Sequence, residues 1–137
     1  MQLLFENSAV KYYLEQLKYK GYDWNSIKYI NENRYAIVQG KTNIAIVFKK
    51  AWFMKFGEMG FVNDEGLPET GIGDSLNVED IKKFIANKVS KIYIVYQDGK
   101  IYWISLVDYL LHSFKWTNKE SKEVRSISIH HYIRLEE

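Results

Sequence analysis

Two continuous apolar runs joined by a short turn constrain the fold of this chain more than any other feature. Residues 34–39 read RYAIVQ and residues 42–50 read TNIAIVFKK, so each run contains at least four successive apolar side chains. Strands with one exposed face alternate apolar and polar residues, whereas continuous runs are typical of strands covered on both faces. Gly40 and Lys41 between the runs suit a tight turn. We therefore predict two neighbouring central strands of a sheet.

Three further segments have the composition of strands. Residues 26–30, SIKYI, precede the two runs and complete a three-stranded meander. Residues 91–105, KIYIVYQDGKIYWIS, predict a hairpin that turns at Asp98 and Gly99. Residues 124–129, VRSISI, alternate as a half-buried strand does.

Helical patterns occupy three other places. Residues 8–20 and residues 78–88 show apolar side chains at helical spacing. A third helix is predicted to carry the chain as far as Phe114. The last two helices open on a polar side chain followed three residues later by an aspartate, which is typical of a capping box: Asn77 with Asp80, and Ser105 with Asp108.

Residues 51–77 are predicted to form one long loop. They include five of the eight glycines and the only proline, and such a length is unusual inside a compact domain unless the loop is functional. The predicted order is therefore helix, three-stranded meander, long loop, helix, hairpin, helix and final strand. That order defines an α+β fold in a single domain over residues 1–137.

Over about residues 8–115 this order resembles that of the PD-(D/E)XK nuclease superfamily. The resemblance implies a frame whose second strand carries an aspartate and whose third strand carries a carboxylate or glutamine two residues before a lysine. Such carboxylates hold a divalent metal together, because Mg²⁺ prefers oxygen ligands, and the lysine helps to activate the attacking water.

Most of the residues that this family uses are absent from the two apolar runs. Residues 34–39 contain no acid, and residues 47–50 read VFKK, with apolar side chains where the carboxylate is expected. Residues 39–41 spell a glutamine variant, QGK, but we interpret the glycine and lysine as the turn of the hairpin. We expect a nuclease-like frame without an intact metal site.

The acidic segment is the other source of metal ligands. Residues 63–80 carry six acidic residues and no basic one, while the flanking segments are mildly basic. Glu58, Asp64 and Asp74 are the candidate ligands if this segment folds over the sheet. Mg²⁺ would be the cofactor of such an enzyme, and in every other interpretation we expect no cofactor. A solvated surface is the simpler interpretation of these acids.

Basic and aromatic residues adjoin one another after the second apolar run. Lys49, Lys50, Trp52 and Lys55 are the candidate nucleic-acid-binding residues, because aromatic rings beside bases can stack on nucleobases. Burial of the rings with their polar tips in water is the alternative. Other aromatic residues also interleave with lysines: Tyr93, Tyr96, Tyr102, Trp103 and Trp116.

Several chemistries are excluded or disfavoured. The absence of cysteine excludes thiolate metal sites and a cysteine nucleophile. The histidines are His112, His130 and His131, and the adjacent pair would point to opposite faces of a strand, which disfavours a shared metal. No apolar run approaches the roughly 20 residues of a membrane span.

Residues 91–129, with their IYIVYQDGKIYWI pair and SISI segment, resemble small uncharacterised proteins of crenarchaeal viruses and their hosts. The resemblance implies an archaeal or archaeal-virus protein that acts in the cytoplasm, which is the host cytoplasm if the protein is viral. A composition rich in lysine and free of cysteine fits a thermophilic source.

We expect an intracellular protein that binds DNA or RNA on a nuclease-like frame and is not an enzyme. Two alternatives stay open. One is a structural or host-interaction module that associates through protein contacts, for example as a homodimer. The other is a metal-dependent nuclease that uses acids of residues 58–74.

Overall fold

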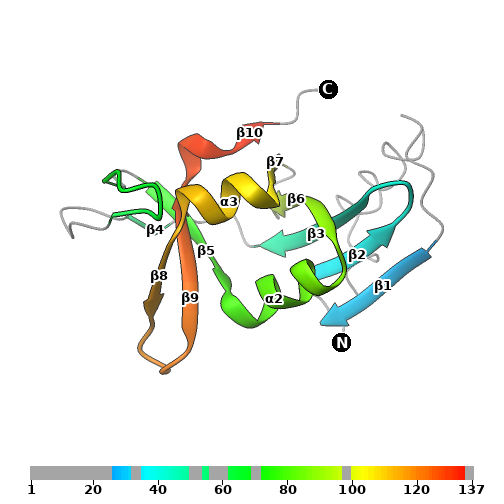
Figure 1. Ribbon diagram of the computed structural model, residues 1–137, viewed down its shortest axis with the longest axis horizontal. Coiled ribbons are helices and arrows are strands. Elements are labelled where there is room, and N and C mark those ends of the chain that lie inside the picture. Colours follow the sequence, from blue (N-terminus) through cyan, green and yellow to red (C-terminus); the bar gives the residue numbers. More distant parts are fainter. Residues whose placement is uncertain are drawn as a thin grey trace.

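The computed structural model describes residues 26–31, 35–49, 54–55, 62–68, 72–96 and 100–134. These residues form two β-sheets and two α-helices (Figure 1), which confirms the predicted α+β class. The helix predicted over residues 8–20 lies outside the described residues.

A six-stranded sheet contains the predicted central strands. Its order is β1 (Ser26–Asn31), β2 (Tyr35–Gln39), β3 (Asn43–Lys49), β6 (Val89–Tyr96), β7 (Ile101–Ser105) and β10 (Ile133–Arg134). The meander β1–β2–β3 and the hairpin β6–β7 are antiparallel, as predicted. The predicted turn at Asp98 and Gly99 lies outside the described residues. Residues 40–42 connect β2 to β3, so QGK serves as a hairpin turn. Strands β3 and β6 pair in parallel.

Because β3 and β6 are parallel, the chain must return to the starting end of the sheet between them. The last part of that crossover is α2 (Val78–Ala86), which confirms the second predicted helix. Asn77 is the N-cap residue of α2, but its side chain makes no capping hydrogen bond. The third helix, α3 (Leu106–His112), begins as predicted, since the Ser105 hydroxyl accepts a hydrogen bond from the Asp108 N–H at 3.0 Å.

A second sheet of four antiparallel strands departs from the predicted order. It consists of β4 (Met54–Lys55), β5 (Ile72–Asn77), β9 (Glu123–Ser128) and β8 (Phe114–Thr117). The predicted loop over residues 51–77 therefore contains a six-residue strand, β5, which reads IGDSLN. Glycine, aspartate and asparagine are rare in strands, so local propensity conceals β5, and pairing with β9 forms it. Phe114 belongs to β8 and not to the preceding helix, because Ser113 already has extended backbone angles.

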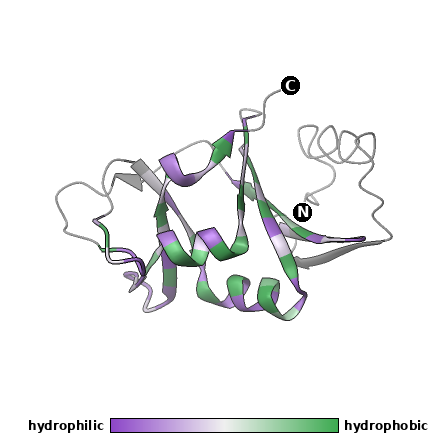
Figure 2. Cartoon of the chain, turned by 45° about the horizontal axis from the view of Figure 1, so that its top comes forward, coloured by the Kyte–Doolittle hydropathy of each residue, from purple (hydrophilic) through white to green (hydrophobic). Residues whose placement is uncertain are grey.

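The hydrophobic core lies between one face of the six-stranded sheet and the helices. Among the described residues, sixteen buried side chains belong to it, including Ile92 and Ile94 of β6, Ile81 and Phe84 of α2, and Tyr109 of α3. Both helices contain a mixture of apolar and polar residues (Figure 2), as is usual for helices that bury one face.

Strand β3 is buried on both faces, as the apolar run predicts. Ala45 and Val47 belong to the core against the helices, while Ile44 and Ile46 point to the opposite face and are equally buried. Within the described ranges, no helix has the length and apolar character that crossing a membrane requires.

Two isoleucines one turn apart on α2 test the position of the core. Ile81 is 3% exposed and Ile85 is 51% exposed. We expect Ile81→Ala to lower the free energy of unfolding by about 2–5 kcal/mol, because it leaves a cavity in the core. The same change at Ile85 should alter it by less than about 0.5 kcal/mol. Denaturant unfolding monitored by circular dichroism gives both values, and similar losses at the two positions would contradict this placement of α2.

Candidate functional site

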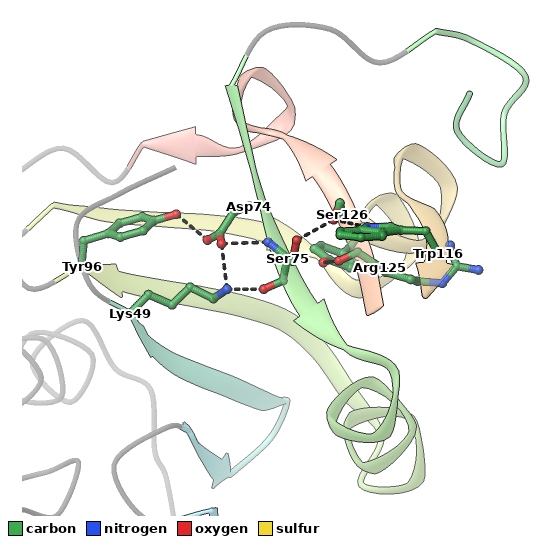
Figure 3. Close-up of polar contacts among 8 residues, drawn as sticks. Lys49, Asp74, Ser75, Tyr96, Trp116, Arg125 and Ser126 are labelled. Carbon is green, nitrogen blue, oxygen red and sulfur yellow. Dashed lines mark hydrogen bonds and ion pairs between the residues drawn. The ribbon is translucent and has the colours of Figure 1, made fainter. Parts of the chain in front are cut away.

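The candidate site lies where the parallel strands β3 and β6 end. Lys49 is the last residue of β3, Tyr96 is the last residue of β6, and the two are partners in the parallel register. The carboxyl ends of parallel strands meet at one edge of a sheet, where α/β proteins commonly place their ligands. Asp74 of β5 reaches this edge from the second sheet (Figure 3).

The Asp74 carboxylate is held by donors from three strands. Its Oδ1 atom lies 2.7 Å from the Lys49 Nζ atom and accepts the Ser75 N–H at 2.8 Å. Its Oδ2 atom accepts the Tyr96 hydroxyl at 2.8 Å. The Lys49 ammonium also donates to the Ser75 carbonyl oxygen. The carboxylate is mostly buried and fully compensated, and it ties the second sheet to the ends of β3 and β6.

The pairing of β5 explains why this aspartate points toward the lysine. Asp74 is opposite Ile127 of β9, and the next residue but one, Leu76, belongs to the core. Alternation along a strand therefore turns Asp74 to the core side of the second sheet. There its charge must be paired, because an uncompensated buried carboxylate is strongly unfavourable.

The negative charge of the Asp74 carboxylate acts on three buried tyrosines. Burial raises the pKa of Tyr96, Tyr109 and Tyr132 well above the usual value, and the negative charge of Asp74 raises each pKa further. The Tyr109 hydroxyl donates to the Arg125 carbonyl oxygen at 3.0 Å. The Tyr132 hydroxyl is buried without a hydrogen-bond partner in the described part of the chain. These phenols stay protonated, so they can donate hydrogen bonds but cannot act as bases.

The arrangement does not fit a divalent metal. The residue two places before Lys49 is Val47, and its cross-strand partner on β2 is Tyr35. Both are buried members of the core, and neither carries the carboxylate that a Mg²⁺ site of this kind requires. Asp74 is one carboxylate whose two oxygens already accept from a lysine and a tyrosine. Over the residues that the structure describes, no group of three histidine, aspartate or glutamate side chains could hold a metal ion.

The sequence-predicted candidates are only partly brought together. Lys49 and Asp74 meet directly, whereas Asp64 lies in the segment 62–68, exposed, with its Oδ2 atom 2.9 Å from the Arg125 Nη2 atom. Strand β4 contains the backbone of Lys55. Three other candidates lie outside the described residues: Lys50, Trp52 and Glu58.

A chain of polar contacts extends from the site into the second sheet (Figure 3). The Ser75 hydroxyl contacts the Ser126 hydroxyl, which accepts the Trp116 indole N–H at 2.8 Å. The indole N–H of Trp116 thus anchors β8 to β9. The sequence analysis gives no sign of this link, because it depends on strand pairing between distant segments.

The histidines form a second cluster that the sequence analysis missed. His112, at the end of α3, stacks on His131 with ring centroids 4.3 Å apart and planes 4° apart. His130 and His131 lie in a 3₁₀ turn, Ile129–His131, with ring centroids 4.1 Å apart. The Glu65 Oε2 atom lies 3.1 Å from the His112 Nδ1 atom. Stacked rings do not direct their nitrogens at one point between them, so the cluster is a stack and not a ligand set.

No protein-family model, curated protein or solved structure shows a significant match to this chain.

Two aspartates that each pair with a cation test the importance of the buried pair. The Asp74 side chain is 10% exposed and that of Asp64 is 52% exposed. We expect Asp74→Asn to lower the free energy of unfolding by about 3 kcal/mol or more, because Lys49 loses its counter-ion in a mostly buried place. Asp64→Asn removes a pair whose carboxylate is half-exposed, and Arg125 keeps its hydrogen bond to the Ser113 hydroxyl, so the change should cost less than about 1 kcal/mol. Denaturant titration measures both, and equal losses would show that the Asp74 pair is no more than a surface contact.

The three buried phenols make the free energy of unfolding depend on pH in the alkaline range. In the unfolded chain a tyrosine ionises near pH 10, whereas the folded-state pKa of Tyr96, Tyr109 and Tyr132 is higher. The folded state therefore retains protons that the unfolded state releases, so the contribution of these three phenols to the free energy of unfolding is constant below about pH 10 and falls above it.

Tyr96→Phe should reduce this alkaline loss, because it removes one of the three groups. Chemical unfolding of wild type and variant at a series of pH values on both sides of about 10 measures the difference, and lysine titration common to both chains cancels. Identical slopes above that pH would contradict the assignment of Tyr96.

Proposed function

We propose that this protein binds nucleic acid on a nuclease-like frame whose metal site is incomplete, and that it does not cut its ligand. One observation carries the proposal. Lys49 stands at the end of β3 beside the parallel strand β6, where the resemblance to the PD-(D/E)XK superfamily puts its lysine, but Val47 and Tyr35 occupy the neighbouring positions.

The topology supports the frame. The described elements include an antiparallel meander, β1–β2–β3, a crossover through α2 to a strand parallel to β3, and then β7 and α3. Apart from the first helix, which lies outside the described residues, this is the element order on which the resemblance rests, with β4 and β5 inserted before α2. This insertion contains Asp74 and places its carboxylate in contact with the Lys49 ammonium.

The electrostatics favour binding over metal-assisted hydrolysis. A two-metal or one-metal mechanism requires carboxylate oxygens that are available to the ion. The Asp74 oxygens are engaged by the Lys49 ammonium and the Tyr96 hydroxyl. Contacts of lysine and arginine with phosphates, by contrast, need no metal and supply most of the affinity in sequence-independent binding.

We expect the protein to bind a fluorescently labelled single-stranded oligonucleotide at low salt, with an affinity that falls linearly as salt rises on logarithmic axes. Fluorescence anisotropy across a salt series measures this. The same mixtures supplied with Mg²⁺ or Mn²⁺ should yield no cleavage products on a gel.

Two other results would redirect the assignment. Absence of any salt-dependent binding to DNA and RNA would remove the proposal. Metal-dependent cleavage that disappears in Asp74→Asn and persists in Asp64→Asn would favour the nuclease that uses acids of residues 58–74.

A protein-interaction module is the second candidate, and one surface feature favours it. Val107 and Leu111 lie one turn apart on α3, and both are exposed. A mass that rises with concentration in analytical ultracentrifugation, without nucleic-acid binding, would support this function.

A further inference from the structure

The face of the six-stranded sheet away from Lys49 carries a different kind of surface. Side chains alternate along β6, and Ile92, Ile94 and Tyr96 belong to the core against the helices. Lys91 and Tyr93 therefore point to the opposite face. The register of the hairpin places Trp103 of β7 opposite Tyr93, so the indole shares that face.

Trp103 is held between a buried and an exposed neighbour. On one side lies the buried ring of Tyr93, with ring centroids 6.4 Å apart and planes inclined at 37°. On the other side, Ile133 of the edge strand β10 is the cross-strand partner of Trp103 and is half-exposed. Trp103 is itself partly exposed, so part of its surface packs against these neighbours and part contacts solvent.

A cation already covers the indole. The Lys91 Nζ atom lies 4.7 Å from the centroid of the Trp103 ring. A contact of this kind at a solvated site is weaker than the stacking of a nucleobase on an aromatic side chain. A base can therefore displace the ammonium from the ring.

The charge around Trp103 fits an anionic partner. Lys91 of β6 lies on the same face as the indole, and strands β6, β7 and β10 contain no acidic residue. The other aromatic residues of these strands are less suited to stacking, because Tyr93 and Tyr96 are buried and Tyr102 packs against the core. A nucleotide supplies the two complementary groups together: a flat base for the indole and a phosphate for the ammonium.

We infer that Trp103 and Lys91 form a binding site for one unpaired nucleotide of a single-stranded nucleic acid. The base stacks on the Trp103 indole, and the Lys91 ammonium moves from the ring to the adjacent phosphate. A duplex is not a ligand of this site, because its bases are already stacked on one another. The inference rests on the proposed nucleic-acid-binding function and assigns that function to the sheet face opposite Asp74.

The test uses the full chain and labelled oligothymidine and oligouridine of about 12 nucleotides, which is within the range that single-strand-binding domains cover. We expect Trp103→Leu to weaken binding to the single strand about tenfold, since each factor of ten corresponds to about 1.4 kcal/mol. Trp103→Phe keeps an aromatic ring and should recover most of the affinity. Leu67→Ala, which changes an exposed apolar side chain in the segment 62–68, is the control and should bind as wild type does.

Lys91→Gln separates the phosphate contact from stacking. It should weaken binding by a few fold and lower the slope of the salt dependence by about one, whereas Trp103→Leu should leave that slope unchanged. This variant changes one half-buried surface side chain, so it also provides a test if Trp103→Leu fails to fold.

The outcomes distinguish the two proposals. Wild-type binding that neither Trp103→Leu nor Lys91→Gln alters would overturn this site and leave the proposed function standing. Wild-type protein that binds neither oligonucleotide at low salt would overturn the proposed function and this site with it. A loss for duplex as large as the loss for single strand would overturn the assignment to an unpaired base.

Discussion

The buried carboxylate of Asp74 is the contact on which the arrangement of the two sheets depends. A charged group in such a position costs several kcal/mol unless donors compensate it. Lys49 of β3, Tyr96 of β6 and the N–H of Ser75 provide that compensation. A shift of one residue in the pairing of β5 would turn Asp74 away from the lysine and leave both charges without a partner. The ion pair therefore selects one register for the second sheet.

The same contact determines what the carboxyl ends of β3 and β6 can do. Lys49 would be a free cation at a strand end without Asp74, and Asp74 would be a candidate metal ligand without Lys49. Together they neutralise one another, and the protonated phenols of Tyr96, Tyr109 and Tyr132 add no negative charge. This neutral, crowded edge supports the proposal that any contact with nucleic acid occurs without metal chemistry.

The two faces of the six-stranded sheet have separate roles because side chains alternate along each strand. The face against the helices holds the core and the Asp74 contact. The opposite face brings Lys91 of β6 to Trp103 of β7 at the side of the sheet where β10 forms a short edge. Lys49 and Trp103 both belong to segments that mix lysines with aromatic residues, yet only the sheet shows that they lie on opposite faces.

Local patterns were sufficient for the central strands, the hairpin and the start of α3. The apolar runs predicted β2 and β3 as central strands, Asp98 and Gly99 marked the β6–β7 hairpin, and Ser105 marked the start of α3. Strand β5 was not predicted, because its residues are typical of a loop. Its pairing partner β9 lies about 50 residues away in the sequence, as the contact of Ser75 with Ser126 shows.

The sequence therefore indicates the chemistry of each residue, whereas the structure shows which residues contact one another. From the sequence alone, Lys49 was a candidate for nucleic-acid binding, Asp74 was a candidate metal ligand, and the adjacent histidines were not expected to share a metal. Local propensity and periodicity are properties of neighbouring residues, so the chain order already specified the central strands, two of the helices and the lack of family carboxylates on β2 and β3. Three contacts come only from the folded chain: the ion pair of Lys49 with Asp74, the stacking of His112 on His131, and the cation–π contact of Lys91 with Trp103. Each contact depends on strand registers or turns that bring distant residues together, and no local pattern encodes these.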